Sequence, residues 1–458
     1  MPSDCEWRPE PAHLPTTLPI RHGGGNRMSM DTEVLVVGSG PAGIAAAATA
    51  ATHGREVLLL DDNLAPGGQI WREATTAAHE EPDEVKRRTF LSLRVSGARI
   101  FSGWRVFDAP RSGVLRAIND SGPEIHAIDV SYEQLVLATG ARERFLPFPG
   151  WTLPGVFGAG GLEALARGGF SVTGKRIVVA GTGPLLLPVA AHLRQMGGRV
   201  TTVAEQASRR QLARFSTFLS SQPGKLIEGL QYRAASGGSR YRPGCWPVAV
   251  LGTDKVESVR LTDGQRTWDE PCDLLACGFH LVPNTELAVL LGCALRDSFI
   301  EVDDAQRTSI SNVFAAGEPI GIAGMESALL TGTMAGLAAA GKLEEAKALL
   351  PRRQKFERFA VRLKTAFALR PELLTLAQPD TIVCRCEDVT CGTLKGYEDW
   401  NDAKRQTRCG MGPCQGRVCG PATEALFGWR ASSVRPPLFP VPLSAMGACP
   451  SSPRQNHK

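Results

Sequence analysis

The sequence predicts an α/β protein with two nested Rossmann-like dinucleotide-binding domains and a small helical domain near the C-terminus. Two segments, residues 32–48 and 175–187, pass from an apolar strand through closely spaced glycines into a helix. The chain has twelve cysteines, and most of them lie at or after Cys384. A chain of 458 residues is too long for one ordinary core, so several domains are expected.

The composition limits the classes of partner. Hydrophobic residues make up 43% and charged residues 21% of the chain, as in globular proteins. The net charge of +5 is spread along the chain, which argues against a nucleic-acid partner. No apolar run is long enough for a membrane span, and we expect a cytoplasmic location. Residues 1–30 lack a signal-peptide core and are expected to be a disordered leader, with Met28 or Met30 as an alternative start.

The first glycine motif predicts a nucleotide-binding site. Gly38, Gly40 and Gly43 form a GxGxxG pattern between a strand and an alanine-rich helix, and a second strand ends at Asp61. The glycines permit a tight turn, close approach of a pyrophosphate and close packing of helix on strand. The helix N-terminus attracts the phosphates, and the acid accepts hydrogen bonds from ribose hydroxyls. The candidate residues are Gly38, Ser39, Gly40, Pro41, Ala42, Gly43, Asp61 and Asp62.

Three later segments identify the dinucleotide as FAD by resemblance. Residues 66–69 (Pro-Gly-Gly-Gln), 132–140 (ending in Ala-Thr-Gly) and 308–318 resemble motifs of two-dinucleotide-binding flavoproteins of the pyridine nucleotide-disulfide oxidoreductase type. The resemblance adds Gly68, Gln69, Ala138, Thr139, Gly140, Gly317 and Glu318 to the FAD site. Most members carry Asp where this chain has Glu318, the residue that holds the ribityl chain. A helix expected to begin near Gly324 would stabilise negative charge on the reduced ring.

The second glycine motif is incomplete. Gly181, Thr182 and Gly183 follow a strand, and Glu205 ends the next strand, but Leu186 occupies the third glycine position. Glu205 suits an unphosphorylated ribose and would repel a 2′-phosphate, while Arg209 and Arg210 leave the choice open. The sequence leaves three alternatives open for this fold: it binds NAD(P)H, it binds another adenine nucleotide, or it is a vestigial site that binds no nucleotide.

The cysteines before residue 300 do not predict a redox disulfide. Cys272 and Cys277 are expected on one apolar strand, where an odd separation places their side chains on opposite faces. We interpret them as buried structural cysteines, which disfavours disulfide reduction.

The C-terminal cysteines predict a metal module. Cys384 and Cys386 form CxC, and Cys409, Cys414 and Cys419 follow at intervals of five residues. Such thiolates bind zinc or an iron–sulfur cluster. The segment resembles the domain related to bacterioferritin-associated ferredoxin, which holds a 2Fe–2S cluster. The resemblance implies Cys384, Cys386, Cys414 and Cys419 as ligands with Cys409 as a substitute, and leaves Cys391 and Cys449 as spectators. The nearby residues Arg385, Arg408 and Arg417 should raise the cluster potential.

These motifs predict the domain organisation. The expected segments are a leader (1–30), an FAD-binding domain in two parts (31–150 and 285–345), a second, NAD(P)-type nucleotide-binding domain (151–284), a helical linker (346–380), a 2Fe–2S domain (381–432) and a tail (433–458).

The order of motifs along the whole chain resembles one family. It looks like the FAD/2Fe–2S subunit that hydrogen cyanide synthase, the opine oxidases and the dye-linked proline or hydroxyproline dehydrogenases share. The resemblance implies a relay subunit whose partner, a second flavoprotein, oxidises an amino acid or opine. We expect its flavin to pass electrons to a dye, a quinone or a similar acceptor. One alternative is a self-sufficient NAD(P)H oxidoreductase. Another is an assembly subunit that holds ATP or AMP structurally.

Overall fold

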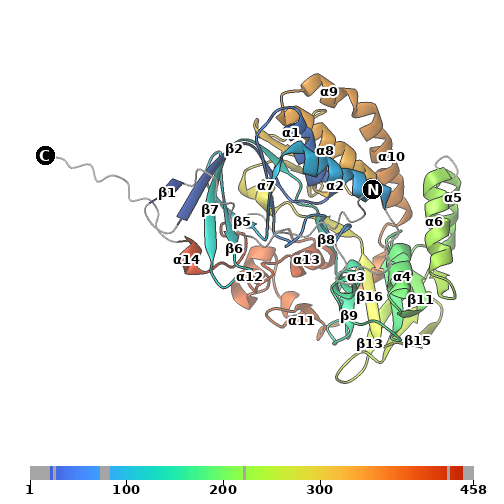
Figure 1. Ribbon diagram of the computed structural model, residues 1–458. Helices are drawn as coiled ribbons and strands as arrows, with labels where there is room; N and C mark the ends of the chain where they lie inside the picture. Colours follow the sequence, from blue (N-terminus) through green and yellow to red (C-terminus); the bar gives the residue numbers. More distant parts are fainter. Residues whose placement is uncertain (1–20, 24–26, 73–82, 220–222, 431–433, 447–458) are drawn as a thin grey trace.

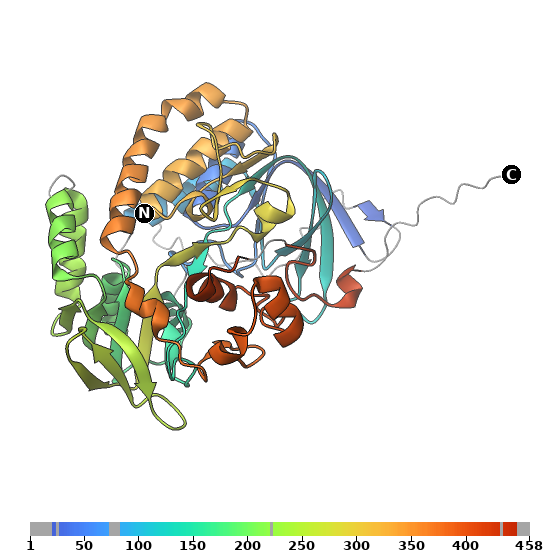
Figure 2. The ribbon, with the colours of Figure 1, turned by 180° about the vertical axis from the view of Figure 1, so that it is seen from behind.

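A computed structural model describes residues 21–23, 27–72, 83–219, 223–430 and 434–446. Two nucleotide-binding domains lie side by side, and the cysteine-rich module lies against both of them (Figure 1). The reverse view shows the same module between the sheet of the first domain and the second domain (Figure 2). Within the described ranges, no helix is both long enough and apolar enough to cross a membrane.

The first domain is built on an eight-stranded mixed sheet. Parallel strands β4, β3, β2, β7 and β20 form its centre, and β1, β5 and β6 add antiparallel pairs. All five residues of β3 are buried, as expected for a strand covered on both faces. The strands are β1 (Arg21–Gly23), β2 (Arg27–Val37), β3 (Val57–Asp61), β4 (Arg99–Ser102), β5 (Arg105–Arg111), β6 (Val114–Asn119), β7 (His126–Leu137) and β20 (Val313–Ala315).

Two small-residue helices cover one face of this sheet. A Cβ atom on Gly332 would lie 2.2 Å from the carbonyl oxygen of Ala42, so glycine permits the close contact between α1 and α8. The helix predicted near Gly324 is confirmed, since α8 begins at Met325 with Gly324 as its N-cap. The helices of this region are α1 (Pro41–Thr52), α2 (Glu84–Ser96), α8 (Met325–Ala339), α9 (Leu343–Ala348) and α10 (Leu350–Ala366).

The prediction of a disordered leader through residue 30 is wrong at its C-terminal end. β2 begins at Arg27, and β1 pairs antiparallel with its first residues. Residues 1–20 and 24–26, which belong to the same prediction, lie outside the described residues. The sheet extends the strand because β7 offers paired backbone groups as far back as Ile128, opposite Met28.

The second domain contains a five-stranded parallel sheet in the order β12-β11-β10-β16-β9. A three-stranded antiparallel sheet packs beside it and was not predicted from the sequence. The strands are β9 (Val156–Gly158), β10 (Arg176–Thr182), β11 (Arg199–Glu205), β12 (Arg240–Pro243), β13 (Trp246–Leu251), β14 (Ser258–Thr262), β15 (Thr267–Pro271) and β16 (Leu274–Phe279). The helices are α3 (Ala159–Arg167), α4 (Leu186–Gln195), α5 (Arg209–Leu219) and α6 (Pro223–Ala235).

Two short antiparallel strands connect the domains. β8 (Ala141–Glu143) leaves the first domain and β17 (Leu281–Pro283) returns to it, with Arg142 opposite Val282. The returning chain then forms α7 (Glu286–Leu290), β18 (Leu295–Arg296), β19 (Phe299–Ile300) and the 3₁₀ turn η1 (Glu318–Ile320).

The cysteine-rich module follows α10 and the 3₁₀ turn η2 (Pro371–Thr375). Its elements are β21 (Ile382–Cys384), β22 (Val389–Thr390), α11 (Cys391–Leu394), α12 (Trp400–Thr407) and α13 (Cys419–Phe427). The chain then returns to the first domain, where Leu438 is buried in the core and its backbone N–H donates to the carbonyl of Phe107 at 2.7 Å. A last helix, α14 (Leu443–Met446), buries Ala445 in the same region.

Candidate cofactor sites

The first glycine motif forms a tight turn with an open face. A Cβ atom on Gly43 would lie 1.7 Å from the carbonyl oxygen of Gly38, and one on Gly38 would lie 2.2 Å from that of Ala138. These two glycines are therefore required by packing. Gly40, in contrast, has no atom within 4 Å of its Cβ position. The open space next to Gly40 and the N-terminus of α1 is where a pyrophosphate would approach the backbone.

Asp61 and residues 66–69 close around this turn. The carboxylate of Asp61 accepts hydrogen bonds from the backbone N–H groups of Ser39 and Asn63. The N–H of Gly67 donates to the carbonyl of Ser39 at 2.8 Å. Gly68 lies so near Gly40 that an added Cβ would be 2.9 Å from the Gly40 Cα. The strand end, the glycine turn and the following loop thus form one connected wall.

The segment 308–318 adds a carboxyl with a buried oxygen to the same edge of the sheet. Gly317 has a φ of 78°, and a Cβ atom there would lie 2.8 Å from the Cβ of Ala42. The next residue, Glu318, is partly buried, and its Oε2 is a buried atom that has no hydrogen-bond partner among the described residues. Burial raises the pKa of this carboxyl to about 7. A buried acceptor without a partner fits a ligand hydroxyl, which is the role predicted for this position in FAD binding.

Most residues predicted for FAD therefore come together at one edge of the sheet. The Ala-Thr-Gly motif (residues 138–140) also lies there, since Gly38 packs on Ala138. The Oγ1 of Thr139 donates to the carbonyl of Asn284 at 2.6 Å. Asp62 and Gln69, which were also predicted to bind FAD, are exposed. The side chain of Ser39 is buried, and its Oγ has no partner within the described part of the chain.

In the second fold the predicted acid is used internally. Glu205 is buried, and its carboxylate accepts hydrogen bonds from the N–H groups of Gly183 and Ala207, both at 2.8 Å. Burial raises its pKa to about 7. Helix α4 begins at Leu186, three residues after Gly183, whereas α1 begins directly after Gly40. Leu186 is itself buried in the core that holds helix against sheet.

A segment after α10 crosses the carboxyl edge of this second sheet. The carbonyl oxygen of Phe367 is within hydrogen-bond distance of Thr182 Oγ1 (3.2 Å), Gln206 Nε2 (3.4 Å) and His280 Nε2 (2.7 Å). Gln206 also contacts the carbonyl of Ala368 at 3.1 Å. The three side chains follow or end β10, β11 and β16, so Phe367 lies over the edge where a dinucleotide binds in open α/β sheets. Sequence patterns gave no sign of this contact.

The placement of Cys272 and Cys277 differs from the prediction. Cys272 lies between β15 and β16, and Cys277 lies within β16, so the two are not on one strand. Both side chains enter the same hydrophobic core. They are free and buried, which confirms the interpretation as structural cysteines.

Five cysteines of the C-terminal module converge in a group that we call the cysteine centre: Cys384, Cys386, Cys409, Cys414 and Cys419. The sulfur atoms of Cys384, Cys409 and Cys419 all lie within 4.8 Å of one another. The sulfur atoms of Cys386 and Cys414 are 3.6 Å apart. Cys391 is buried on α11 outside this group, and Cys449 lies outside the described residues.

Local folding explains how these thiols meet. Cys384 ends β21, Cys419 begins α13, and the loop between α12 and α13 carries the other two C-terminal thiols. A Cβ atom on Gly412 would lie 2.2 Å from the Cβ of Cys386, so glycine allows the loop to approach the CxC segment. The thiol groups of Cys409 and Cys419 stabilise the Cys384 thiolate and lower its pKa. Hydrogen bonding from Cys419 likewise lowers the pKa of Cys414 to about 5, which favours metal binding.

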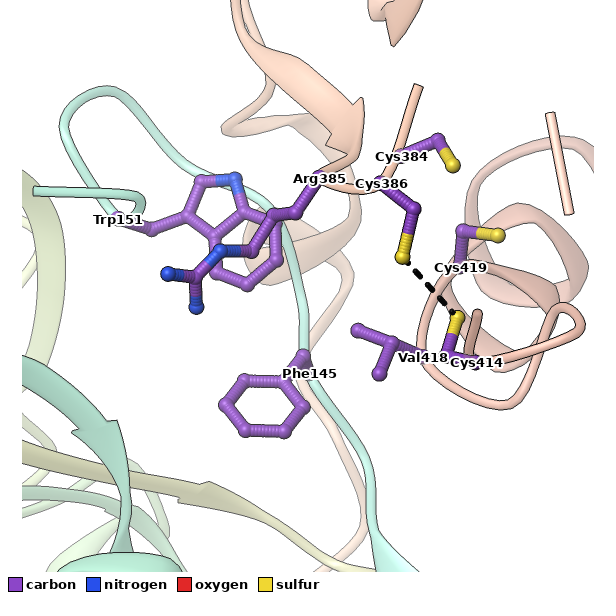
Figure 3. Close-up of a pocket in the computed structure, with 8 residues that line it drawn as sticks. All are labelled: Phe145, Trp151, Cys384, Arg385, Cys386, Cys414, Val418 and Cys419. Atoms are coloured by element: carbon purple, nitrogen blue, oxygen red, sulfur yellow. Dashed lines mark hydrogen bonds between the residues drawn. The ribbon is translucent and has the colours of Figure 1, made fainter. Parts of the chain in front are cut away.

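A cavity of about 250 Å³ adjoins four of these thiols. Figure 3 shows it between the cysteines and two aromatic residues of the second domain, Phe145 and Trp151. The Trp151 indole N–H donates to the carbonyl of Ile382 at 2.7 Å, which ties this wall to the module. The four lining cysteines are Cys384, Cys386, Cys414 and Cys419, while Cys409 does not line the cavity. The cavity and its donor set fit a small thiolate-bound metal cluster.

The three arginines predicted near the centre have different contacts. The Arg385 guanidinium lies 5.5 Å from the centre of the Trp151 ring. Arg408 Nε is 2.7 Å from Glu387 Oε2, so much of its charge is locally balanced. Arg417 Nη2 donates to the carbonyl of Leu438 at 3.0 Å. Arg385 is thus the arginine that directly borders the cavity.

Comparison with known proteins places these sites in a family context. Residues 32–343 match the family model described as pyridine nucleotide-disulphide oxidoreductase. The chain is 30% identical to an opine oxidase subunit of Agrobacterium tumefaciens, over 92% of each protein. It is 31% identical to hydrogen cyanide synthase subunit HcnB of Pseudomonas aeruginosa, over 91% of this chain and 98% of the relative. The crystal structure of L-proline dehydrogenase from P. horikoshii aligns with a TM-score of 0.64 at 18% identity, covering 93% of this chain and 81% of that one.

Proposed function

Because the chain belongs to the pyridine nucleotide-disulphide oxidoreductase family, we propose that it is the electron-relay subunit of a heteromeric amino-acid or opine dehydrogenase or oxidase. The chain is a flavin-dependent oxidoreductase, since the family binds FAD. The relatives that match it over nine-tenths of its length are named as subunits, of opine oxidase and of hydrogen cyanide synthase. By this similarity, the present chain would also form a complex with a second subunit. That subunit would be a flavoprotein that oxidises a C–N bond.

The proposal is supported above all by two candidate cofactor sites of different kinds on one chain. The glycine turn, Asp61 and Glu318 would hold FAD, and the cysteine centre would hold a 2Fe–2S cluster. A flavin exchanges two electrons with a substrate and a cluster exchanges one, so together they connect hydride chemistry to single-electron acceptors. Such an acceptor could be a dye or a quinone at a membrane surface. We propose that this reaction takes place in the cytoplasm.

An iron–sulfur cluster is favoured over zinc by the spacing of the thiols. Four of them line one cavity. Zinc sites with thiol ligands usually use CxxC pairs, whereas this chain has a CxC pair followed by cysteines five residues apart. Metal and acid-labile sulfide analysis of the purified chain tests this. About two iron atoms and two sulfides per chain are expected, and zinc without sulfide would contradict the proposal.

The alternative of a self-sufficient NAD(P)H oxidoreductase is disfavoured by the segment at Phe367. Its carbonyl takes hydrogen bonds from three strand ends at the edge where the dinucleotide would lie. Anaerobic titration with NADH and NADPH is the direct test. We expect no bleaching of the flavin, whereas rapid bleaching would establish the alternative.

A further alternative, a structural ATP or AMP in the second fold, is tested by chromatography of the nucleotides released on denaturation. FAD alone is expected.

Substrate oxidation is assigned to the partner subunit. The relatives that match nearly the whole chain are named as subunits, which supports a partner that carries the substrate site. The purified chain should therefore fail to oxidise opines, proline or glycine with a dye as acceptor. It should support that activity once its partner is co-expressed. Full activity of the isolated chain would refute the proposal of two subunits.

A further inference from the structure

One arginine on the strand that leaves the first domain reaches the cysteine module. Arg142, on β8, donates from Nε to the carbonyl oxygen of Arg417 at 3.0 Å. The same side chain donates from Nη1 to Asn284 Oδ1 at 2.7 Å and pairs with Glu286 at 2.9 Å. Arg417 lies inside the loop that joins Cys414 to Cys419. A single guanidinium therefore holds this loop of the cysteine centre against the connection between the two nucleotide-binding domains.

The other end of this contact is the predicted FAD site. Asn284 Nδ2 donates to the carbonyl of Thr139 at 2.8 Å, and its backbone N–H donates to the carbonyl of Gly140 at 3.0 Å. Thr139 Oγ1 donates back to the carbonyl of Asn284 at 2.6 Å. Hydrogen bonds thus run without a break from the Ala-Thr-Gly motif through Asn284 and Arg142 to the cysteine loop.

The loop is held from its other side as well. The guanidinium of Arg417 lies 3.9 Å from the centre of the Phe439 ring and donates to the carbonyl of Leu438. The side chains of Arg142 and Arg417 are 23% and 17% exposed, so solvent competes little for these contacts. The planar guanidinium of Arg142 contacts Arg417, Asn284 and Glu286 at once. A lysine ammonium on a flexible stem cannot reproduce these contacts in the same geometry.

We propose that Arg142 is a positioning residue for electron transfer between the flavin and the cysteine-bound cluster. The inference rests on the proposed relay function. With both cofactors bound, one electron would pass from the reduced flavin to a ferric iron of the cluster, and the accompanying flavin proton would be released to water. Electronic coupling falls steeply with separation and is better through bonded contacts than across a gap. Arg142 keeps the Cys414–Cys419 loop at a fixed, bonded separation from the FAD site.

The test measures the transfer step directly in the holoprotein. Laser-flash photoreduction of the bound flavin with EDTA as donor is followed by the absorbance of the cluster. Arg142→Gln should slow cluster reduction on the order of tenfold, and Arg142→Lys should give an intermediate rate. FAD content, iron content and both midpoint potentials should stay at wild-type values, which separates lost coupling from lost driving force. Arg260→Gln, which removes an exposed pair with Asp269, should leave the rate unchanged.

A second variant serves as the test if Arg142→Gln does not retain its cluster. Asn284→Ala interrupts the same hydrogen-bonded connection from outside the cysteine module and should also slow the transfer. Wild-type transfer in Arg142→Gln, or in Asn284→Ala when Arg142→Gln cannot hold its cluster, would overturn the inference. A wild-type chain that lacks flavin or iron would instead refute the proposed function, so the two failures are distinguishable.

Discussion

Single residues of the glycine turn have separable roles in folding and in binding. Gly43 and Gly38 touch backbone atoms of their own domain, whereas the Cβ position of Gly40 faces open space. Glu318 contributes a carboxyl with a buried, unpartnered oxygen at the same edge. Substitutions at neighbouring positions of one motif should therefore act on different properties of the protein.

Gly40→Ala should fold normally and bind FAD poorly. The added methyl meets no protein atom, so the unfolding midpoint of the apoprotein should stay near that of wild type. It occupies the approach of the pyrophosphate, so FAD affinity should fall roughly tenfold or more. Gly43→Ala is the matched comparison, because its methyl would overlap the Gly38 carbonyl, and it should destabilise the apoprotein by on the order of 3 kcal/mol. Thermal unfolding and fluorescence titration with FAD measure the two effects, and equal stability of both variants would contradict this assignment.

Glu318 should make apoprotein stability depend on pH. Its pKa is raised from 4.5 to about 7 by burial, so the unfolded state loses its proton first. The stabilisation is complete below pH 4.5 and is lost as the pH rises through 7. Glu318→Gln removes this dependence and should gain stability over wild type by up to roughly 3 kcal/mol at pH 8.

Urea unfolding of the apoprotein at several pH values checks the prediction for Glu318. Glu33→Gln is a control of opposite sign. A backbone hydrogen bond from Glu56 lowers the pKa of the Glu33 carboxyl. That variant should lose stability relative to wild type as the pH rises. A difference between Glu318→Gln and wild type that is the same at all pH values would contradict the prediction.

At the scale of elements, the loop between α12 and α13 and the first residue of α13 bring three thiols to a centre that the CxC segment completes. The arrangement supplies five cysteines, one more than a 2Fe–2S cluster needs. Four of them line the cavity and Cys409 does not, which favours the ligand set implied by the ferredoxin-like resemblance. The sulfur of Cys409 nevertheless lies close to those of Cys384 and Cys419, so the alternative in which Cys409 replaces one of the four ligands has a geometric basis.

Cys409→Ser should retain the cluster, whereas Cys419→Ser should lose it. The first change leaves all four cavity-lining thiols in place, and the second removes one of them. Iron content and the EPR signal of the reduced protein report the outcome. An iron-free Cys409→Ser protein together with an iron-loaded Cys386→Ser protein would identify Cys409 as the true ligand.

At the scale of the whole molecule, the segment after the module fastens it to the first domain. Residues 434–446, expected to be a tail, place Leu438 in the core of the FAD-binding domain. The module also contacts the second domain through Trp151, and the segment at Phe367 contacts that domain's sheet edge. The cysteine module is therefore an integral part of the structure, since it contacts both nucleotide-binding domains.

Leu438→Ala should weaken this attachment. Removing a buried leucine side chain costs roughly 2–5 kcal/mol, and Leu438 is 5% exposed. Leu443→Ala is the matched control, because that leucine is 85% exposed and its loss should be nearly neutral. Denaturant unfolding followed by flavin and cluster absorbance would measure both. Equal stability of the two variants would mean that the segment does not pack as described.

Sequence by itself predicted the two nucleotide-binding folds, because strand, glycine turn and helix are local patterns. It also named candidate residues for FAD, most of which meet at one edge of the first sheet. It also located the cysteine-rich module, although not the grouping of its fifth thiol. Tertiary structure alone decided the rest. Arg142 and Arg417 are 275 positions apart, and Phe367 lies 185 positions from Thr182. Hydrogen bonds over such separations leave no periodic signal, because they depend on how whole domains pack.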